Sequence, residues 1–409
     1  MSYEPVLTAR IGVVNPTSLT EYEAHGGFQA LARAVELGPD RVVSLIEAAK
    51  LLGRGGAAFP AGVKWRAVHR AEGPKFVVAN GDESEPGAFK DRAIMEGDPY
   101  ALIEAVILAG YATGASKGFI YIRGEYAVAY ERLRQAAARC YEAGYLGENV
   151  LGSGFAFHLE LRRGAGAYIC GEETALFESI EGKRGYPRLK PPFPTEAGLF
   201  GRPTLINNVE TLIAASHVIL RGPDWFNGIG APAAPGPKLY PLSGRVHRPG
   251  LVEAPTGITL RELIEEHGGG VSGSGEFQAA LVGGAAGAFL GPDQLDTPLD
   301  FATLARVGAA LGAGAVMVLD ASVDLMNVLE RVADFFAHES CGKCYPCQLG
   351  TMRQRDIIRR MAAGRGRPGD LQLLRDIGQT MRDASICGLG QTASSAILSA
   401  FDKFPLPVA

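Results

Sequence analysis

The chain has 409 residues, of which 47% are apolar, and this is enough core material for two or three domains. Its 40 basic residues are balanced by 44 acidic ones, so a net charge of −4 argues against nucleic acid or an anionic membrane surface as a partner. The first residues lack the pattern of a secretion signal, and no run of about 18 apolar residues occurs. We therefore expect a cytoplasmic protein without direct membrane insertion, which partners could hold at the inner face of a membrane.

The first 235 residues alternate between helical and strand-like segments. Apolar residues recur at helical spacing over residues 28–35 and 42–52. An apolar run at 75–80, a helix from about 100 to 111 and a second apolar run at 118–123 follow. This alternation predicts an α/β domain with a parallel sheet, which binds ligands at the carboxyl ends of its strands. The acidic turn at 80–85 should therefore lie in a ligand site.

Two further domains are predicted beyond a Pro-, Gly- and Ala-rich boundary at residues 230–237. Strand patterns at 238–244, 250–253 and 277–282, with a helix at 260–267, predict a β-grasp (ubiquitin-like) domain over residues 238–322. Helical spacing from Asp324 onward, and in the segments 349–361, 370–382 and 392–401, predicts a four-helix bundle over residues 324–409. The α/β domain would occupy residues 1–235.

The glycine-rich segment Gly53-Arg54-Gly55-Gly56-Ala57-Ala58 matches the dinucleotide-binding pattern G-x-G-x-x-A. That fingerprint follows a strand, whereas the residues before Gly53 are helical, so the simple Rossmann assignment fails. The absence of side chains would still let backbone amides approach a phosphate or a flat ring, with Arg54 and Lys64 adding positive charge. An ordinary turn that ends a helix explains the motif equally well.

Acidic and polar side chains follow the predicted strands. Residues 80–87 bring carboxylates together with Asn80 and Ser84, which suits the hydroxyls of a ribose or a ribityl chain. Residues 164–174 repeat this combination of glycines followed by paired acids. The stiff loop 189–194 projects Lys190 and Phe193, which either flank a nucleotide base or belong to a rigid strap. One of Asn207 and Asn208 could simply cap the next helix.

Three cysteines lie within seven residues, in the spacing C-x-x-C-x-x-C at Cys341, Cys344 and Cys347. Cys387, which also lies in a glycine-bearing turn, is the best candidate for a fourth ligand. A triplet with one remote cysteine is typical of a cubane iron-sulfur cluster. Structural zinc is the alternative, although zinc sites usually have two separated C-x-x-C pairs.

These motifs, in this order from about residue 51 to residue 398, closely resemble a family of NADH- and flavin-binding chains, the 51 kDa-type F subunits of respiratory complex I, soluble NAD-reducing hydrogenases and NAD-dependent formate dehydrogenases. The resemblance implies three cofactors and substrates: FMN, NAD(H) and one 4Fe-4S cluster. It implies that FMN is bound by Gly53, Arg54, Gly55, Gly56, Lys64, Asn80, Asp82, Glu83, Ser84, Tyr168, Gly171, Glu172, Ile206, Asn207, Asn208 and Thr211. NADH would contact Phe59, Glu85, Glu173, Lys190 and Phe193. The cluster would be held by Cys341, Cys344, Cys347 and Cys387.

The family further implies a diaphorase that exchanges hydride between NAD(H) and FMN and passes single electrons through the cluster to partner subunits. Glu173 would discriminate against the 2′-phosphate of NADPH. Ala67 replaces an aromatic residue common in complex I relatives, and Ala58 and the turn at 387–392 are more similar to the hydrogenase and formate dehydrogenase branch. The F subunit of complex I, an NADH-quinone oxidoreductase, is the alternative.

The partners implied by the resemblance lie on other chains. No thioredoxin-like ferredoxin domain precedes the α/β region, so we expect a 2Fe-2S protein of that fold as a partner, together with a larger iron-sulfur or catalytic subunit. The sequence does not indicate the terminal electron acceptor.

Overall fold

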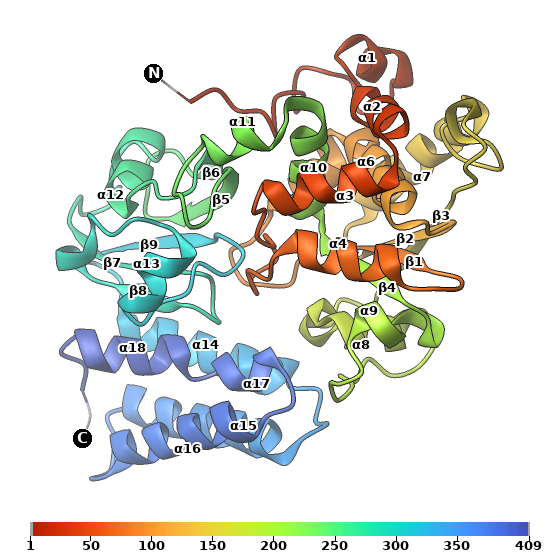
Figure 1. The fold of residues 1–409 in the computed structure, drawn as a ribbon. Coiled ribbons are helices and arrows are strands. Elements are labelled where there is room, and N and C mark those ends of the chain that lie inside the picture. Colours follow the sequence, from red (N-terminus) through yellow and green to blue (C-terminus); the bar gives the residue numbers. More distant parts are fainter. Residues whose placement is uncertain (1–2, 408–409) are drawn as a thin grey trace.

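The computed structural model describes residues 3–407, which form two β-sheets and a C-terminal group of helices (Figure 1). The first sheet has the strand order β3-β2-β1-β4, and all of its neighbouring strands are parallel. These strands are β1 (Phe76–Gly81), β2 (Lys117–Ile122), β3 (His158–Arg163) and β4 (Thr204–Asn208). Because Gly81 pairs with Ile122, and Asn80 with Asn208, the loops that follow β1, β2 and β4 meet at one edge of the sheet.

Helices cover both faces of this sheet. Val77 and Ala79 of β1 pack against helices on one face, whereas Val78 packs on the other face with α8 and the C-terminal helices. A strand buried on both sides has this pattern. The helices of this part are α1 (Leu19–Ala24), α2 (Gln29–Leu37), α3 (Pro39–Ala48), α4 (Ala61–Arg70), α5 (Lys90–Gly97), α6 (Pro99–Thr113), α7 (Ala127–Glu142), α8 (Glu173–Ile180), α9 (Pro194–Ala197), α10 (Val209–Arg221) and α11 (Pro223–Asn227), with short 3-10 turns at Val150–Gly152, Tyr168–Gly171 and Leu199–Gly201.

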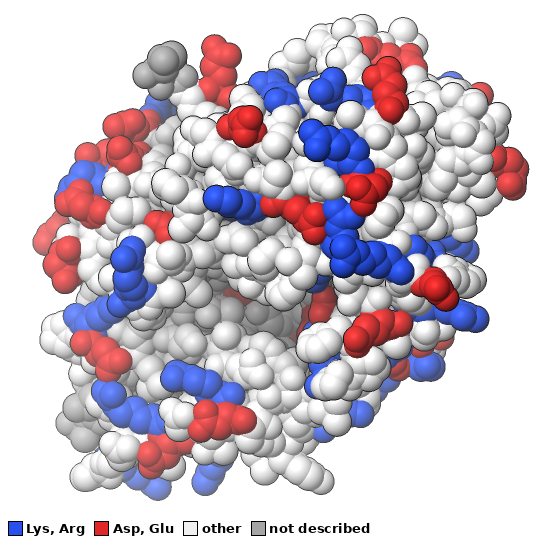
Figure 2. All heavy atoms as spheres, viewed as in Figure 1, with Lys and Arg blue, Asp and Glu red and all other residues white. Residues whose placement is uncertain are grey.

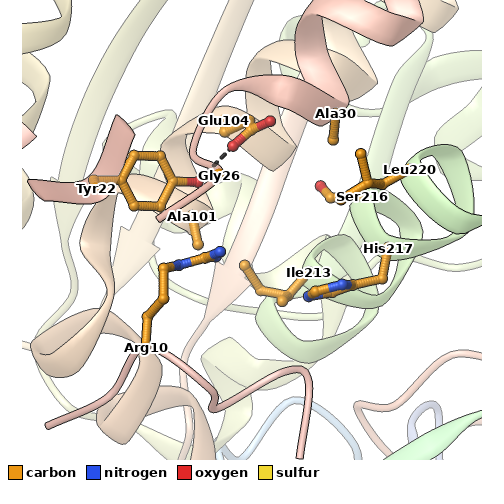
Figure 3. Close-up of a pocket in the computed structure, with 10 residues that line it drawn as sticks. All are labelled: Arg10, Tyr22, Gly26, Ala30, Ala101, Glu104, Ile213, Ser216, His217 and Leu220. Carbon is orange, nitrogen blue, oxygen red and sulfur yellow. Dashed lines mark hydrogen bonds between the residues drawn. The ribbon is translucent and has the colours of Figure 1, made fainter. Parts of the chain in front are cut away.

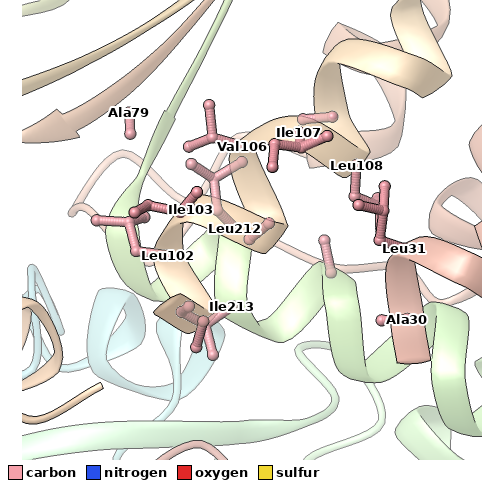
Figure 4. Packing of buried hydrophobic residues seen from close by; sticks show 14 of the residues in the cluster. Ala30, Leu31, Ala79, Leu102, Ile103, Val106, Ile107, Leu108, Leu212 and Ile213 are labelled. Carbon is pink, nitrogen blue, oxygen red and sulfur yellow. The ribbon is translucent and has the colours of Figure 1, made fainter. Parts of the chain in front are cut away.

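Helix α6 lies at the centre of the larger core (Figure 4). It is apolar on nearly every side, so it can only be stable when other helices enclose it. Its Val106 belongs to the same buried cluster as Leu31 of α2 and Leu212 of α10. Pro99 begins the helix and Gly114, with a left-handed backbone, ends it.

The second sheet has the strand order β6-β5-β9-β7-β8. Its strands are β5 (Pro237–Gly244), β6 (Gly250–Pro255), β7 (Phe277–Val282), β8 (Ala288–Leu290) and β9 (Val316–Asp320). Strand β5 runs parallel to β9, and the other pairs are antiparallel. Helix α12 (Leu260–Glu262), which continues as a π-helix over Leu263–His267, and α13 (Phe301–Arg306) complete this unit around its own apolar core, with a 3-10 turn at Pro292–Gln294.

The C-terminal helices are α14 (Leu325–Glu339), α15 (Tyr345–Ala362), α16 (Asp370–Ala384), α17 (Gly388–Thr392) and α18 (Ser395–Lys403). Helix α14 packs against α15 and α18, and α15 packs against α16. Their apolar core also contains Val78 of the first sheet and Leu281 of the second sheet. The three parts of the chain are therefore joined through one shared core.

The N-terminal segment crosses from the second sheet to the first part of the molecule. The buried carboxylate of Glu253, in β6, accepts hydrogen bonds from the backbone N–H groups of Val6, Leu7 and Thr8 at 2.7–2.9 Å. The Tyr3 and Thr8 hydroxyls donate to the same carboxylate at 2.6 and 2.7 Å. A little further on, Arg10 pairs with Asp98 of the α/β part at 2.7 Å. This segment thus ties two units together.

The structure confirms the parallel α/β sheet and the helical segment before the glycine loop. Strands β1 and β2 and the long helix α6 lie where the sequence predicts them. Strands β3, β4, β8 and β9 were not predicted. The expected helix at 260–267 is confirmed in position but forms a π-helix over its second half.

Candidate functional site

The loops at the carboxyl edge of the first sheet face the second sheet and the C-terminal helices. Gly56 of the glycine loop lies against Gly312 of the second unit, with the nearest Gly312 atom 3.8 Å from an added Cβ. The surface has a hollow at this junction, between α4, the second sheet and the C-terminal helices (Figure 2). The glycine loop, which carries several predicted ligand residues, therefore lies at the junction of two units.

The glycine loop lies over the N-terminus of α10. The Gly53 N–H donates to the Phe59 carbonyl at 2.9 Å, and the Arg54 N–H donates to Thr211 Oγ1 at 2.8 Å. A Cβ at Gly55 would lie 3.0 Å from Cβ of Asn208, so a side chain there would push the loop away from the helix. The N-terminus of a helix presents free N–H groups and favours an anion. This arrangement is compatible with a bound phosphate.

Buried ions lie directly beneath this loop. Lys90 donates to Asp91 at 2.7 Å and pairs with Glu210 at 3.1 Å, while Lys238 of β5 pairs with Glu210 at 3.1 Å. Burial lowers the pKa of Lys238 to about 8. Arg54 is also fully buried, and its Nη2 donates to the Pro235 carbonyl at 2.7 Å.

Arg54 retains two donor atoms, Nε and Nη1, that have no partner within residues 3–407. An unpaired buried donor is costly, so these atoms point to an anion that completes the site. The phosphate of FMN fits this requirement, because it brings oxygen acceptors and negative charge to Arg54. The loop that contains Arg54 also lies over the buried Lys90 and Lys238.

Asp82 and its neighbours form a polar patch at the end of β1. Ser84 donates to Asp82 Oδ2 at 2.5 Å, and the Asn80 amide donates to the Gly171 carbonyl at 2.9 Å. Burial raises the pKa of Asp82 to about 7, and Ser84 and Arg123 oppose the shift. Asp82 Oδ1 has no partner among the described side chains and backbone groups. A free buried acceptor of this kind suits a ribityl hydroxyl.

Three predicted FMN residues also hold helix ends. Both oxygens of Glu83 accept backbone N–H groups at the start of α5, at 2.9 Å each. Glu172 caps α8 by accepting from the backbone of Thr174 and Ala175 at 2.8 and 2.9 Å. Asn208 caps α10, and its amide also bonds Lys90 and Asp91. These contacts fix the loops around the hollow.

Asn207 and Ile206, near the end of β4, contact helix α4. Asn207 Oδ1 accepts from Trp65 Nε1 at 3.0 Å, and the Ile206 carbonyl accepts from Lys64 at 3.4 Å. Both contacts join β4 to helix α4, which follows the glycine loop.

An outer group of side chains surrounds Glu173, at the start of α8. Its carboxylate pairs with Lys64 at 3.1 Å and with Lys190 at 2.6 Å. Burial raises the pKa of Glu173, but the two lysines outweigh it and leave the pKa below its usual value. Phe59 and Phe193 are 48% and 52% exposed.

Glu85 and Tyr168 connect the β1 loop to the C-terminal helices. The Tyr168 hydroxyl donates to Glu85 Oε2 at 2.7 Å, and the Ala286 N–H donates to Glu85 Oε1 at 3.1 Å. The Tyr168 N–H donates to Glu339 Oε2 at 2.9 Å. The Tyr168 ring also packs edge-on against Phe335, with ring centroids 5.1 Å apart.

The four predicted cysteine ligands lie in one region. Cys344 and Cys387 stand immediately before α15 and α17, Cys347 lies in the first turn of α15, and all share an apolar cluster with Cys341. Gly390 lets α17 approach α15, because a Cβ there would lie 2.8 Å from Cβ of Cys347. Burial raises the pKa of the Cys387 thiol to about 12, and the N–H groups of Leu389 and Gly390 oppose this shift.

The two metal hypotheses differ in the spacing that they require of the four sulfurs. Four thiolates on one zinc ion, with Zn–S bonds of about 2.3 Å, bring the sulfurs within about 3.8 Å of one another. Within residues 3–407 no three Cys, His, Asp or Glu side chains converge closely enough to hold a single metal ion. An iron-sulfur cubane is larger than a single ion, so its four thiolates stand further apart than those around zinc.

A separate cavity of about 30 Å³ lies away from this hollow, between the N-terminal segment, α6 and α10 (Figure 3). Tyr22 donates to Glu104 at 2.5 Å there, and Arg10 and His217 also line it. Burial, followed by the charges of Arg10 and Arg221, lowers the pKa of His217 to about 3. The cavity has room for about one water molecule and is not a site for a nucleotide.

The comparisons with known proteins agree with this geometry. The Nuo51 FMN-binding domain matches residues 46–217, and the NADH-ubiquinone oxidoreductase-F iron-sulfur binding region matches residues 327–408. An SLBB domain matches residues 240–284. The second F subunit of NADH-quinone oxidoreductase of Rhizobium meliloti (strain 1021) is 48% identical over 98% of this chain and 96% of its own length. This chain belongs to the family of NADH-quinone oxidoreductase F subunits.

Hydrogenase subunits are also members of this family. The NADP-reducing hydrogenase subunit HndC of Solidesulfovibrio fructosivorans is 43% identical over 98% of this chain and 81% of its own length. A crystal structure of NAD+-reducing [NiFe]-hydrogenase in the H2-reduced state superposes with a TM-score of 0.85 at 36% identity over 98% of this chain. This chain spans 65% of that hydrogenase chain, so the larger protein extends well beyond it.

The family assignment establishes the cofactors and the class of activity. The protein is an oxidoreductase subunit with an FMN-binding domain and a 4Fe-4S region, and its nucleotide substrate is NADH. Relatives in this family are subunits of larger complexes, so the protein acts with partners. None of the described helices is both long and apolar enough to cross a bilayer.

Several residues of the site escaped prediction from the sequence. Lys90, Glu210 and Lys238 have charged side chains, and charged residues are normally exposed, so nothing in their local sequence indicates burial. Arg123 follows β2 directly, and the rule that ligands gather at strand ends could have identified it.

Proposed function

We propose that this chain is the diaphorase subunit of a soluble hydrogenase- or formate-dehydrogenase-like complex, exchanging electrons between NAD(H) and a partner subunit. FMN, when bound, supplies the exchange between hydride transfer and single-electron transfer. The observation that carries the proposal is a set of contacts that runs from the strand-end loop to the end of helix α14, next to the cysteines in the sequence. Glu85 bonds Tyr168, and Tyr168 bonds Glu339, which lies two residues before Cys341.

Different residues of the site would bind different parts of FMN. The loop at Gly53, Gly55 and Gly56, with Arg54 and Thr211, would hold the phosphate at the start of α10. Asn80, Asp82 and Ser84 would hold the ribityl hydroxyls, with Gly171 and Tyr168 closing the pocket from the other side. No side chain needs to act as a nucleophile or a general base, because these residues bind, orient and tune.

Glu173 would bind the ribose hydroxyls of NADH, with Phe59 and Phe193 against the planar rings. A 2′-phosphate would meet this carboxylate, although Lys64 and Lys190 would partly offset the repulsion. We expect Glu173→Gln to raise kcat/KM for NADPH relative to NADH about tenfold, which corresponds to about 1.4 kcal/mol. Steady-state kinetics with both nucleotides would measure this ratio.

Glu178→Gln is the matched control, because Glu178 lies on the same helix but pairs with Arg188 outside this group. A nucleotide preference that stays the same in Glu173→Gln would remove Glu173 from the nucleotide site.

The cysteine assignment has its own test. Replacing Cys387 with alanine should abolish the electron paramagnetic resonance signal of the reduced cluster and lower the iron content, while FMN content stays close to that of the unmodified protein. Cys140→Ala, at a buried cysteine of α7, is the control and should leave both cofactors in place. A wild-type protein with zinc and no iron would contradict the proposal.

A complex I subunit is the second candidate, favoured by the name of the 48% identical Rhizobium relative. The subunit composition of the complex, purified through a tag on this chain, would distinguish the two candidate functions. A small 2Fe-2S protein of thioredoxin fold and a larger hydrogenase or formate dehydrogenase subunit would support our proposal. Membrane-embedded, quinone-linked subunits would support the alternative.

We further propose three domains, at residues 1–235, 238–322 and 324–409. The strand order β6-β5-β9-β7-β8 with parallel central strands supports a β-grasp fold for the second. The four longer helices after Asp324 support a four-helix bundle for the third. We infer a cytoplasmic location, supported by a cluster site that needs reduced thiols.

A further inference from the structure

Helix α15 carries an apolar stripe on its solvent side. Tyr345, Leu349 and Met352 are 77%, 56% and 43% exposed. Their spacing of four and three residues places them on one face of the helix, away from the buried Ile357, Ile358 and Met361. Side chains of this size are normally buried, and three adjacent ones indicate a contact surface. The stripe starts directly after Cys344, a proposed ligand of the cluster.

A basic groove continues from this stripe. Between α15 and the start of α16, a groove of about 340 Å³ is lined by Arg353, Ile357, Arg360, Arg367, Asp370 and Leu373. Asp370 holds Arg360 through two contacts. Arg353, whose side chain is 72% exposed, lies 3.9 Å from Asp356, and Arg367 is exposed, so both side chains present positive charge to solvent. The apolar Leu373 is 44% exposed beside them.

The charge of this region is opposite to that of the whole chain. From residue 343 to residue 367 the sequence has Lys343 and several arginines but one acid, Asp356, whereas the chain as a whole carries a net charge of −4. Asp334 pairs with Arg359 and Asp370 pairs with Arg360, so the excess positive charge rests on the other basic side chains of this segment. Complementary charge steers and orients a partner, and exposed apolar side chains next to it supply contact area.

We infer that the α15 stripe and the adjoining groove bind an acidic segment, with apolar side chains, of the partner subunit that takes electrons from the cluster. This inference rests on the proposed function, since it places the electron-accepting partner beside Cys344. A second copy of this chain fits poorly, because it would bring one basic groove against another. An anionic membrane complements the charge but has no reason to lie at the cysteine ligands.

The position of the partner can be tested in the native complex. A photoreactive p-benzoylphenylalanine in place of Leu349 should cross-link to a partner subunit, through a peptide rich in Asp and Glu. The same group in place of Val128, an exposed apolar residue of α7, should not. Flavin and iron content would verify that both variants fold. Cross-links from position 349 to a second copy of this chain, to lipid or to a basic peptide would overturn the inference. The absence of any cross-link from this position would overturn it as well.

Electron delivery gives a second, independent readout. Arg353→Glu should lower the rate at which NADH reduces the native acceptor at least tenfold, and raising the salt concentration should lower the wild-type rate. Reduction of ferricyanide by NADH should stay unchanged, because it reports on the FMN site alone. Arg134→Glu is the matched control, since Arg134 is also exposed and also faces an acid three residues away on a helix.

A failure of the proposed function and a failure of the docking surface would give different results. A wild-type complex that does not oxidise NADH with ferricyanide would refute the proposed function. Normal ferricyanide reduction combined with equal native rates in Arg353→Glu and Arg134→Glu would refute only the docking surface.

Discussion

At the scale of single residues, Asp82 shows how burial prepares a side chain for a ligand. The carboxylate lies at the end of β1 and receives one hydroxyl, from Ser84, which leaves one oxygen unpaired within the described part of the chain. Burial therefore raises its pKa to about 7. A ribityl hydroxyl that donates to the free oxygen would favour the charged form and lower this pKa again.

This linkage predicts that FMN affinity depends on pH. Below pH 7 Asp82 is protonated in the FMN-free protein, and binding must expel the proton, whereas above pH 7 it need not. We expect FMN to bind up to about tenfold more tightly at pH 8 than at pH 6, by fluorescence titration. In Asp82→Asn this part of the pH dependence should disappear. Identical pH profiles for the two proteins would show that Asp82 does not contact the flavin.

At the scale of elements, the buried ions join helix α10 to strand β5. Glu210 is the central acid, because it faces Lys90 and Lys238 and also accepts the Leu239 N–H at 2.9 Å. Burial raises the pKa of Glu210, but Lys238 and Lys90 more than compensate and lower it. Removing the acid would leave Lys238 without a carboxylate partner, whereas removing Lys238 leaves Glu210 paired with Lys90.

Glu210→Gln should therefore destabilise the protein by about 3–5 kcal/mol, the usual cost of breaking a buried ion pair from one side. Lys238→Met should cost less, because Lys90, which also pairs with Asp91, still lies 3.1 Å from Glu210 and a methionine side chain fills the space. Urea unfolding of both variants would compare the two free energies. A larger loss in Lys238→Met would mean that Lys238, and not Glu210, organises the network.

The same elements show what the sequence could and could not predict. Helix α6 and strands β1 and β2 were predictable because their patterns are local, and the cysteine spacing alone indicated a cluster. Strand β4 was not, since its five residues end in two asparagines and it forms by pairing with β1, far away in the chain. Lys238 could not be recognised either, because its burial depends on Glu210 and on the Ala313 carbonyl, which come from other elements.

At the scale of the whole molecule, the hollow exists because three units are held against one another. The shared apolar core joins the first sheet to the C-terminal helices, and Tyr168 crosses the same junction by hydrogen bonds. The second sheet is attached to the α/β part through Lys238 beneath the glycine loop and through Glu253 at the N-terminal segment. Gly56 packs against Gly312 only while this attachment holds.

Glu253 is therefore expected to affect FMN binding from a distance. Glu253→Ala would leave three backbone N–H groups and two hydroxyls of the N-terminal segment without their acceptor, at a cost of about 1–3 kcal/mol for each group that stays buried. The N-terminal segment should then detach, lowering the melting temperature and raising the rate of FMN release. Glu276→Ala, at an exposed acid of the same unit, is the control. The variant could lose stability and still release FMN at the unchanged rate. The loop that holds the phosphate would then not have loosened, and the attachment of the second sheet would not govern the flavin site.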